Sequence, residues 1–381
     1  MIRGGAVEAA AHSTGTSHLR IVHAVLSGGF YGSERYCIDL AIAQARAGHH
    51  VTVLAQDERS DCVQQFRASI AQAEATAALT GSLRLVVISR RPWLQRAAAW
   101  RMLRKLRPGI VHTHLNPAAR RIGRVAERLG IPHVSTLHIH YNEREHAPCD
   151  GLIALTRAQL KLIPEKLHGK VAVIRLGLPA TVEDAIAQVS PKQADALRRQ
   201  WRAGEADIVF GSVGRLTPVK GMDVLVRAFG KAFADRQVAV RLVIVGDGED
   251  RGGLEQLAAG DDRIFFAGHQ GEIAPFYRAF DVFVSSARFE PFGLAIVEAM
   301  AAGCALVVTK TDGPAEFLTD PRALWATPGR EDELAAQLRA AAARQRERLS
   351  YDLSRLKIGH LAQEIEAFYR RILRAPGQMA G

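Results

Sequence analysis

The run LRIVHAVLSGGFYGSERYCIDLAIAQARAGHHVTVLA, residues 19–55, decides the fold class of this chain. It opens with a short apolar run, passes through a glycine turn into a helical pattern that begins at about Ser33, and returns to a second apolar run at HHVTVLA. Apolar runs of this length, separated by helical residues, are typical of strands buried on both faces of a parallel sheet. The stretch therefore predicts a strand–helix–strand unit of the α/β class.

The same rhythm continues outward from this unit. A helix over residues 61–78 and strands at LRLVVIS, IVHTHL, PHVSTLH, GLIAL and VAVIRL complete a doubly wound α/β domain. The rhythm stops at the polar connection LGLPATVEDAIAQVSPKQADALRRQ, and restarts with strands at IVFGSVG, RLVIVGDG, RIFFAG, FDVFVSS, CALVVT and ALWAT. We therefore predict two Rossmann-like domains facing each other across a cleft, with ligands at the carboxyl ends of the strands.

The pattern also gives domain limits. We expect a flexible tail over residues 1–18, a first domain over 19–178, a second domain over 179–350, and a C-terminal helix and tail over 351–381. The helix is expected over residues 351–373, with apolar side chains at Leu353, Leu356, Ile365, Phe368 and Ile372. One arrangement open to it is a return to the first domain.

Length and composition exclude several classes of protein. The 381 residues suit two domains of about 150 residues each. Hydrophobic residues make up 48% and charged residues 23%, which excludes disordered and membrane-spanning chains. The four cysteines form no CxxC pair, so we expect reduced thiols rather than a disulfide framework or zinc clamp. With neither a signal peptide nor a transmembrane segment predicted, we expect a cytoplasmic protein.

The net charge of +11 belongs entirely to the first half of the chain. Residues 1–178 hold 24 Lys and Arg against 12 Asp and Glu, whereas residues 179–381 hold 26 against 27. A basic nucleic-acid-binding protein is one reading of this excess. It is disfavoured, because the charge is confined to one domain and no nucleic-acid module is recognisable.

The glycine turn after the first strand, SGGFYGSER (residues 27–35), suits an anion. Gly28 and Gly29 allow backbone N–H groups to approach a phosphate at a helix N-terminus. The plainer alternative is a glycine pair needed only for the turn. The motif is not GxGxxG, since Phe30 replaces the second glycine, which argues against an NAD-dependent dehydrogenase.

Two cations follow the first strand of the second domain. In GSVGRLTPVKGMDVLVRAF, Arg215 and Lys220 lie between a strand and an apolar helix. At the carboxyl edge of a sheet, such a pair can hold a pyrophosphate without a metal, the arginine as a planar fork and the lysine as a point charge. Two solvated loop charges are the alternative.

The segment SSARFEPFGLAIVEAMAAGCALVVTK is a strand, a loop with Glu290, and a helix beginning near Phe292. The free amides of Phe292, Gly293 and Leu294 at that helix start would suit phosphate oxygens. Carboxylates repel phosphate, so Glu290 and Glu298 are expected to accept hydroxyl groups, one from a sugar and the other from a ribose. The alternatives are a helix-start acid for Glu290 and an exposed charge for Glu298.

These blocks carry a family resemblance. GGFYGSERYCIDLAIAQARAGHHVTVL, GRLTPVKGMDVLVRAF and FEPFGLAIVEAMAAG resemble the blocks of family 4 glycosyltransferases, retaining enzymes of the GT-B fold. The resemblance spans about residues 20–368 and includes an acidic pair with seven residues between its members. It implies that Glu290 contacts the donor sugar and Glu298 the ribose, that Arg215 and Lys220 clamp the diphosphate, and that Gly29 approaches the donor phosphate.

The resemblance also implies a histidine beside the reacting sugar. The block VSTLHIHYN places His138 at the end of a strand, where it would hydrogen-bond a donor-sugar hydroxyl. His112, His114 and His140 remain competing candidates. The family's usual Asn-Gly hinge reads RLGLP here, which leaves the hinge geometry open.

Residues 84–107 form a basic segment without an acid. A helix starting at Pro92 would carry Trp93, Ala97, Trp100 and Leu103 on one stripe. We consider docking on anionic lipid or on an anionic lipid-linked acceptor, against a core-packed helix with a solvated arginine face. The basic residues are Arg84, Arg90, Arg91, Arg96, Arg101, Arg104, Lys105 and Arg107.

We therefore expect a retaining transferase that moves a sugar from a nucleotide diphosphate sugar to a glycan, lipid-linked or small-molecule acceptor in glycan biosynthesis, such as that of lipopolysaccharide or exopolysaccharide. The first domain would bind the acceptor and the second the nucleotide sugar. No cofactor or metal is expected to be required, and no nucleic acid is expected as a partner. A nucleotide-sugar epimerase or a phosphorylase of the same fold is the alternative.

Overall fold

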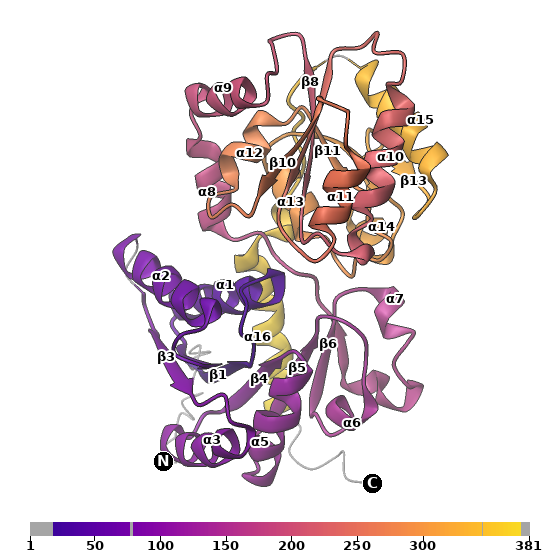
Figure 1. Ribbon diagram of the computed structural model, residues 1–381. Helices are drawn as coiled ribbons and strands as arrows, with labels where there is room; N and C mark the ends of the chain where they lie inside the picture. The colour runs from indigo at the N-terminus through magenta and orange to yellow at the C-terminus, as the bar shows by residue number, and fades with distance from the viewer. Residues whose placement is uncertain (1–17, 77–78, 345, 375–381) are drawn as a thin grey trace, which may run out of the picture.

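The computed structural model describes residues 18–76, 79–344 and 346–374, and shows two α/β domains stacked along one axis (Figure 1). This confirms the predicted fold class. Of the predicted tail at residues 1–18, only His18 lies within the described residues, and residues 375–381 also lie outside them. All four cysteines are buried and unbridged.

The first domain is built on a seven-stranded parallel sheet of order β3-β2-β1-β4-β5-β6-β7. Because the strand order reverses between β1 and β4, the loops that leave these two strands part to opposite faces of the sheet. A ligand site is expected at such a switch point. The strands are β1 (Arg20–Val25), β2 (His50–Gln56), β3 (Ser82–Ile88), β4 (Ile110–His114), β5 (His133–Leu137), β6 (Gly151–Ala154) and β7 (Val171–Val173).

Helices cover both faces of this sheet. On one face lie α1 (Gly32–Arg46), α2 (Asp61–Thr76) and α16 (Ile358–Arg374), and on the other lie α3 (Pro92–Leu106), the π-helical turn η1 (Ala119–Gly123) and α5 (Arg124–Arg128). Burial on both faces explains the near-continuous apolar runs of the strands. Shorter elements are α4 (Asn116–Ala118), α6 (Glu143–His146), α7 (Arg157–Leu160) and the 3-10 helix η2 (Glu165–Lys170).

The second domain has a six-stranded parallel sheet of order β10-β9-β8-β11-β12-β13, with its own switch point between β8 and β11. The predicted polar connection forms two helices, α8 (Ala180–Gln188) and α9 (Pro191–Gln200). The strands are β8 (Ile208–Val213), β9 (Val240–Val245), β10 (Ile264–Gly268), β11 (Val282–Ser285), β12 (Ala305–Thr309) and β13 (Leu324–Ala326).

Two helical layers also enclose the second sheet. One contains α10 (Met222–Ala232), α11 (Arg251–Leu257) and α15 (Glu331–Ala342), and the other contains α8, α9, α12 (Ala274–Ala279) and α13 (Leu294–Ala301). The 3-10 helix η3 (Pro218–Lys220) and helix α14 (Asp312–Phe317) lie in loops that follow β8 and β12. The domain limits given by the sequence stay predictions.

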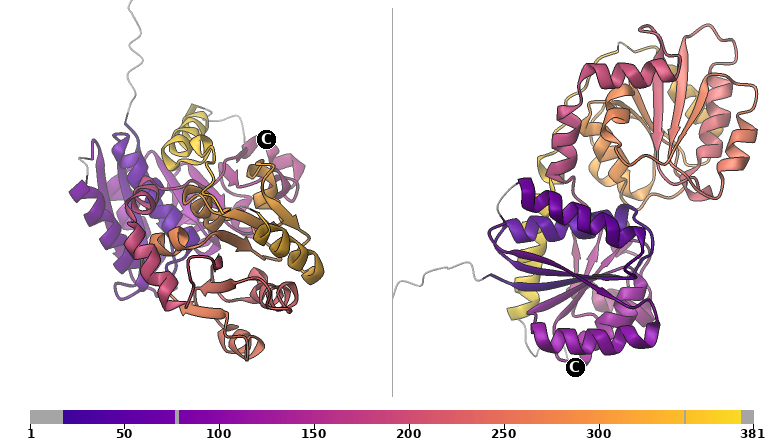
Figure 2. Two further views of the ribbon diagram at one scale, coloured as in Figure 1. Left: turned by 90° about the horizontal axis from the view of Figure 1, so that it is seen from above. Right: turned by 60° about the vertical axis from the view of Figure 1, so that its left-hand side comes forward.

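The C-terminal helix α16 begins at Ile358, so the predicted start at Tyr351 is wrong. The hydroxyl of Tyr351 donates to the carbonyl of Cys304 at 2.8 Å, which holds this segment along the second domain before a 3-10 turn, η4 (Ser354–Leu356). Helix α16 then returns to pack on α1 of the first domain (Figure 2). Where it returns, the amide of Leu178 donates to the carbonyl of Leu356 at 2.6 Å, so the chain crosses between the domains twice, side by side.

Candidate functional site

The loops at the switch point of the second sheet bring Lys220 and Glu290 together. Lys220 ends η3 after β8, Glu290 follows β11, and the lysine Nζ lies 2.5 Å from the carboxylate Oε2. Their side chains are 26% and 14% exposed, so the pair is screened from bulk water only in part. Two residues that the sequence assigns to neighbouring parts of a donor, its diphosphate and its sugar, thus form one charged unit.

The start of α13 lies beside this pair. The helix begins at Leu294, so the predicted start near Phe292 was two residues early, and Gly293 caps it with φ +104°. A side chain at position 293 would bring its Cβ within 2.9 Å of Ile296 and 3.3 Å of Glu290, so glycine is required there. Among the described residues nothing accepts a hydrogen bond from the amides of Phe292, Gly293 and Leu294. These amides can therefore bind an anion.

Glu298 is buried on α13 and held by two donors. The hydroxyl of Tyr277 donates to Oε2 at 2.7 Å, and Nη1 of Arg35, from the first domain, lies 3.2 Å from Oε1. Burial and the neighbouring carboxylate raise the pKa of Tyr277 well above its usual value, so this hydroxyl stays a donor. Glu298 is therefore not a solvated helix charge, and each of its oxygens keeps a second lone pair for a ligand hydroxyl.

Arg215 follows β8 and is exposed. Its guanidinium lies over the ring of Tyr31, from the first domain, at 4.8 Å from the ring centroid. No carboxylate of the described residues pairs with it. Its positive charge is therefore available where the two domains meet, which suits a cation that binds a ligand.

The glycine turn after β1 reaches the second domain. A Cβ at Gly32 would lie 3.8 Å from Leu294, at the start of α13. Neither Gly28 nor Gly29 has a left-handed φ. A Cβ at Gly28 would meet nothing within 4 Å, whereas one at Gly29 would meet the ring of Tyr31 at 2.5 Å. Chain geometry alone therefore does not require glycine at position 28. The space beside Gly28 is open, and a ligand could occupy it.

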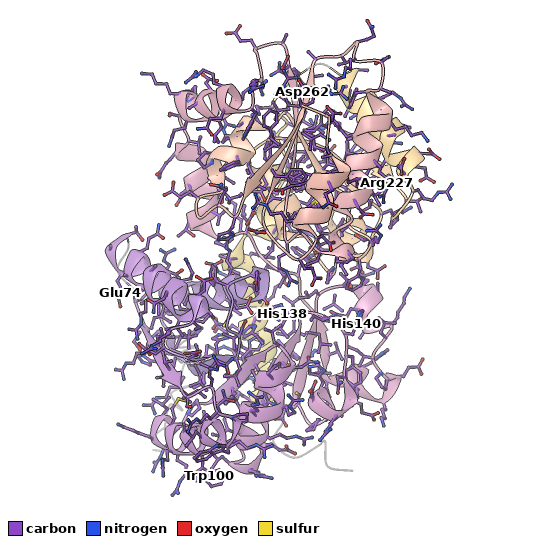
Figure 3. The ribbon with its side chains drawn as sticks, viewed as in Figure 1. Glu74, Trp100, His138, His140, Arg227 and Asp262 are labelled. Atoms are coloured by element: carbon purple, nitrogen blue, oxygen red, sulfur yellow. The ribbon has the colours of Figure 1, made fainter. Side chains whose placement is uncertain are left out.

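His138 lies half-buried after β5, on the side of the first domain that faces the second (Figure 3). Its Nε2 lies 3.1 Å from Nδ1 of His114, and burial lowers its pKa to about 4. His112 and His114 are buried in β4, whereas His140 is exposed and lies 5.0 Å from the ring of Phe289 of the second domain. His138 and His140 are thus the two candidates that face the second domain.

Sequence reasoning missed Tyr31, Arg35, Tyr277 and Glu316. The side chain of Glu316 accepts from the amide of Ala158 at 2.9 Å, which adds another contact between the domains. Arg35 and Tyr31 stand inside the SGGFYGSER block, so their place after a strand was a signal for them. Nothing in the sequence marks Tyr277, because only the packing of α12 on α13 brings it to Glu298.

One group of metal-ligating side chains is found within the described residues, formed by His23, His112 and His114. All three are buried in the first sheet, behind His138. The loops at the carboxyl ends of the second sheet contain no such group in the part of the chain that the structure describes.

Comparison with protein-family models matches nearly the whole described chain. The model Glycosyltransferase Family 4 matches residues 30–209, and the model Glycosyl transferases group 1 matches residues 207–344. Together these regions contain every residue of the site described above except Gly28 and Gly29, which lie just before residue 30.

Curated relatives agree with these matches. The chain is 27% identical over 286 residues to mannosylfructose-phosphate synthase of Agrobacterium fabrum, covering 64% of this chain and 62% of that protein. It is 33% identical over 246 residues to a GDP-mannose-dependent alpha-mannosyltransferase of Mycobacterium tuberculosis, covering 58% and 62%. It is 39% identical over 119 residues to the lipopolysaccharide core biosynthesis glycosyltransferase LpsE of Rhizobium meliloti, covering 30% and 33%. The matched regions thus span less than two thirds of these relatives.

Solved structures share the fold over the full length. The Anabaena protein Alr3699/HepE in complex with UDP and glucose superposes with a TM-score of 0.70 at 21% identity, covering 94% of this chain and 98% of that one. The alpha,alpha-trehalose 6-phosphate synthase of Burkholderia multivorans has a TM-score of 0.70 at 16% identity, covering 94% and 100%. The two-domain architecture is therefore that of GT-B glycosyltransferases, and the chain belongs to the family 4 glycosyltransferases.

Proposed function

We propose that this protein transfers a sugar from a nucleotide diphosphate sugar to an acceptor, with retention of configuration at the anomeric carbon. The observation that carries the proposal is the Lys220–Glu290 ion pair beside the open amides at the start of α13. Cation, carboxylate and free amides are the groups that recognise, in turn, a diphosphate, sugar hydroxyls and phosphate oxygens.

The leaving diphosphate gains negative charge as its bond to the sugar breaks. Arg215, Lys220 and the amides around Gly293 lie where they can take up that charge, and they act most strongly in the transition state, where the charge is largest. The protein thus has fixed cations and helix-end dipoles that can stabilise the negative charge of the leaving diphosphate, which other enzymes stabilise with a divalent ion. We therefore propose that turnover does not require a metal.

Glu290 and His138 are the residues that we assign to the donor sugar. Once a diphosphate attracts Lys220, the oxygens of Glu290 are free to accept sugar hydroxyls. The imidazole of His138 approaches from the other domain and hydrogen-bonds another hydroxyl, which supports positive charge developing at the anomeric carbon. With the acceptor on the same face as the departing phosphate, a phosphate oxygen takes the acceptor proton and the configuration is retained.

Glu298 belongs to the ribose. Its carboxylate is held by Tyr277 and Arg35. Glu298 lies about one helical turn after Leu294, the last of the amides that we assign to the phosphate. One curated relative is a GDP-mannose-dependent alpha-mannosyltransferase, and the HepE structure is a complex with UDP and glucose. We propose a nucleoside diphosphate hexose as the donor. Nothing in the comparisons supports an epimerase or a phosphorylase.

A panel of nucleoside diphosphate sugars in a thermal-shift assay tests the proposal. We expect one donor class to raise the Tm of the wild type, and to raise it markedly less in Glu290→Ala and Lys220→Ala. Lys231→Ala is the matched control, because Lys231 pairs with Asp332 on the exposed surface of α10 and α15. Equal Tm shifts in all four proteins, or no shift with any donor, would contradict the proposal.

We also propose that helix α3 docks the protein on anionic lipid, so that a lipid-linked acceptor can be used. The predicted stripe is wrong in one respect: Leu103 is buried with Gln95 and Ala99, whereas Trp93 and Trp100 are 68% and 38% exposed. Both exposed tryptophans belong to a helix that contains arginines and no acid, and Trp100 lies at the far end of the first domain from the second (Figure 3). Aromatic side chains flanked by cations suit the headgroup region of an anionic membrane. Of the described residues, none belongs to a helix long and apolar enough to span a bilayer.

A further inference from the structure

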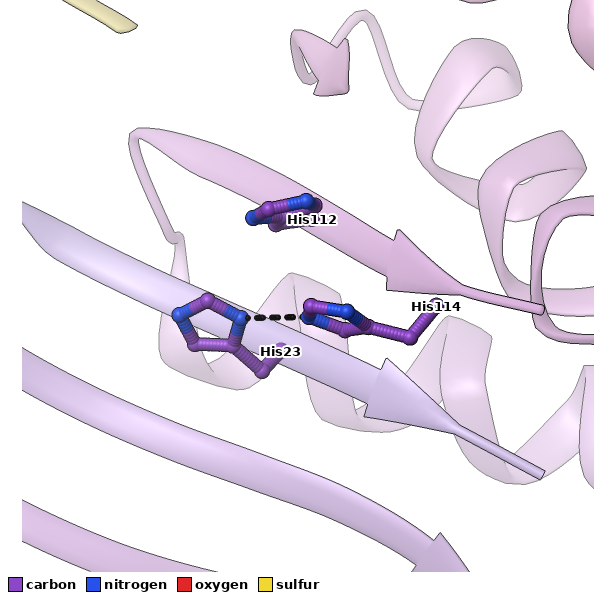
Figure 4. A group of neighbouring side chains, drawn as sticks. All are labelled: His23, His112 and His114. Atoms are coloured by element: carbon purple, nitrogen blue, oxygen red, sulfur yellow. Dashed lines mark hydrogen bonds between the residues drawn. The ribbon is translucent and has the colours of Figure 1, made fainter. Parts of the chain in front are cut away.

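A chain of three hydrogen bonds runs from the core of the first domain to His138. Oε1 of Gln44 lies 2.7 Å from Nε2 of His23, and Nδ1 of His23 lies 3.0 Å from Nε2 of His114. Nδ1 of His114 then lies 3.1 Å from Nε2 of His138. Figure 4 shows the central bond of this chain, between His23 and His114.

Strand register explains why these rings meet. β1 and β4 are parallel neighbours in which His23 pairs with His112 and Val25 pairs with His114. Side chains two residues apart point to the same face of a sheet, so His112 and His114 share the face that α1 covers. Gln44 is buried on α1 above this face, and its carboxamide meets His23.

The three histidines in this series of hydrogen bonds, His23, His114 and His138, are neutral at pH 7. Burial lowers the pKa of His23 and of His138 to about 4 and that of His114 well below its usual value. A neutral imidazole has one N–H donor and one lone-pair acceptor. The three rings can therefore form all three hydrogen bonds only if every N–H points the same way along the chain.

In the structure the carboxamide of Gln44 presents Oε1, and not its NH₂ group, to His23, and this orientation sets that direction. The Oε1 atom can only accept, so His23 carries its proton on Nε2 and offers the Nδ1 lone pair to the Nε2–H of His114. The Nδ1 lone pair of His114 then accepts from Nε2–H of His138. This leaves Nδ1 of His138 as a lone pair.

We propose that Gln44, His23 and His114 are positioning residues that fix His138 in its Nε2–H tautomer, so that its Nδ1 accepts a hydrogen bond from a hydroxyl of the donor sugar. The part that concerns the sugar rests on the proposed function. The assignment of the His138 tautomer does not depend on the proposed function. The chain ends at an amide that cannot take a proton, so it orients His138 and does not carry protons away.

The same histidines do not form a metal site. All six ring nitrogens of His23, His112 and His114 have hydrogen-bond partners, and those of His112 are Tyr369 at 2.5 Å and Thr136 at 2.7 Å. The ring of His114 stacks on that of His112, with centroids 4.4 Å apart and an interplanar angle of 29°, whereas it meets the ring of His23 edge to edge through the hydrogen bond of 3.0 Å. A metal ion lies in the plane of each ring that binds it, and stacked rings do not converge on one point.

Nitrogen-15 NMR of the histidine-labelled protein at pH 7 tests the tautomer directly, because the two neutral tautomers give different long-range ring correlations. The His138→Gln spectrum identifies the His138 signals by their loss. We expect the wild type to show the Nε2–H form of His138. The Nδ1–H form, an equal mixture of the two, or binding of one Zn²⁺ per chain with loss of these signals would overturn the proposal.

Two leucine variants separate positioning from stability. Gln44→Leu removes the acceptor that sets the direction, and we expect a mixture of His138 tautomers and about a tenfold lower kcat/KM. Gln95→Leu is the control, since Gln95 is equally buried in the same domain and bonds Gln56 and Arg121 instead. We expect it to change kcat/KM less than twofold.

Gln44→Glu completes the series. A carboxylate still accepts from His23, so we expect this variant to keep the Nε2–H form of His138. An unchanged His138 tautomer in folded Gln44→Leu would overturn the proposal. If the wild type transfers no sugar, the proposed function fails, whereas the NMR result still decides whether the chain of hydrogen bonds sets the tautomer.

Discussion

Arg35 and Glu298 form an ion pair that joins the two domains, with Nη1 of the arginine 3.2 Å from Oε1 of the carboxylate. Arg35 lies on α1 of the first domain and Glu298 on α13 of the second. The carboxylate that we assign to the ribose is therefore already oriented by a residue of the opposite domain. We therefore expect nucleotide binding at Glu298 to be coupled to the relative position of the two domains through this side chain.

Replacing Glu298 should weaken nucleotide binding. Glu298→Ala removes the ribose acceptor and leaves Arg35 and the buried Tyr277 hydroxyl without their partner. A hydrogen bond to a charged group contributes about 1.5–3 kcal/mol, so we expect a 10- to 150-fold higher Kd for the nucleoside diphosphate by calorimetry. Tyr277→Phe, which keeps the ring and the carboxylate, should cost less than tenfold. A Kd unchanged in Glu298→Ala would remove the ribose assignment.

Replacing Lys220 should slow the chemical step more than it weakens binding. The lysine balances the charge of a diphosphate that becomes more negative in the transition state, so its effect falls chiefly on kcat. By analogy with the loss of one donor to a developing oxyanion, we expect Lys220→Ala to lower kcat about 10²- to 10³-fold. Lys220→Arg should recover part of it. A variant that raises KM with kcat intact would instead indicate equal binding of substrate and transition state.

Removing metal ions should leave turnover unchanged. Arg215, Lys220 and the amides at the start of α13 supply positive charge at the place where the leaving group develops negative charge. We expect the initial rate after EDTA treatment and desalting to stay within about twofold of the untreated rate. Loss of turnover with the chelator and its return with Mg²⁺ would refute this prediction.

Buried histidines should make the first domain sensitive to mild acid. Burial lowers the pKa of His133 to about 3, of His23 and His138 to about 4, and of His114 well below its usual value. In the unfolded chain a histidine has a pKa of about 6.5, so below that pH the unfolded state binds more protons. As the pH is lowered below about 6.5, the free energy of unfolding should therefore decrease by up to about 1.4 kcal/mol per pH unit for each of these histidines.

One carboxyl group opposes this trend. Burial raises the pKa of Asp39 to about 7, so its contribution to stability is full at low pH and is lost as the pH rises through 7. Because at least four histidines oppose one aspartate, we expect the urea midpoint to fall between pH 7 and pH 5. A constant or rising midpoint would show that these histidines are protonated in the native state.

Membrane docking should depend on the exposed face of α3. In flotation with anionic liposomes, we expect Trp93→Ser with Trp100→Ser to lower the bound fraction, and replacement of Arg96, Arg101 and Arg104 by glutamine to lower affinity by about 1 kcal/mol for each charge. Leu257→Ser is a control, since Leu257 is an exposed apolar residue of the second domain. Equal flotation of all these proteins would show that α3 does not bind lipid.

The sequence was a good guide to single elements and to residues at strand ends. Apolar runs predicted the two parallel sheets, because burial on both faces leaves a mark in every strand. Arg215, Lys220 and Glu290 could be placed at one edge of the second sheet, because they lie in loops that follow its strands and parallel strands end at one edge. On α3 the sequence failed to decide the buried face, since Trp100 and Leu103 are both compatible with one helical stripe until the sheet and α5 select Leu103.

What the sequence alone determined is therefore local: strands, helices, and the chemical groups that stand where a strand ends. Only the tertiary structure decided which of these groups meet, as in the pairs Arg35–Glu298 and Gln44–His23. The physical reason is one of range. Burial and backbone periodicity act over a few neighbouring residues and can be read from them. A hydrogen bond between residues 263 positions apart depends on how two complete domains pack.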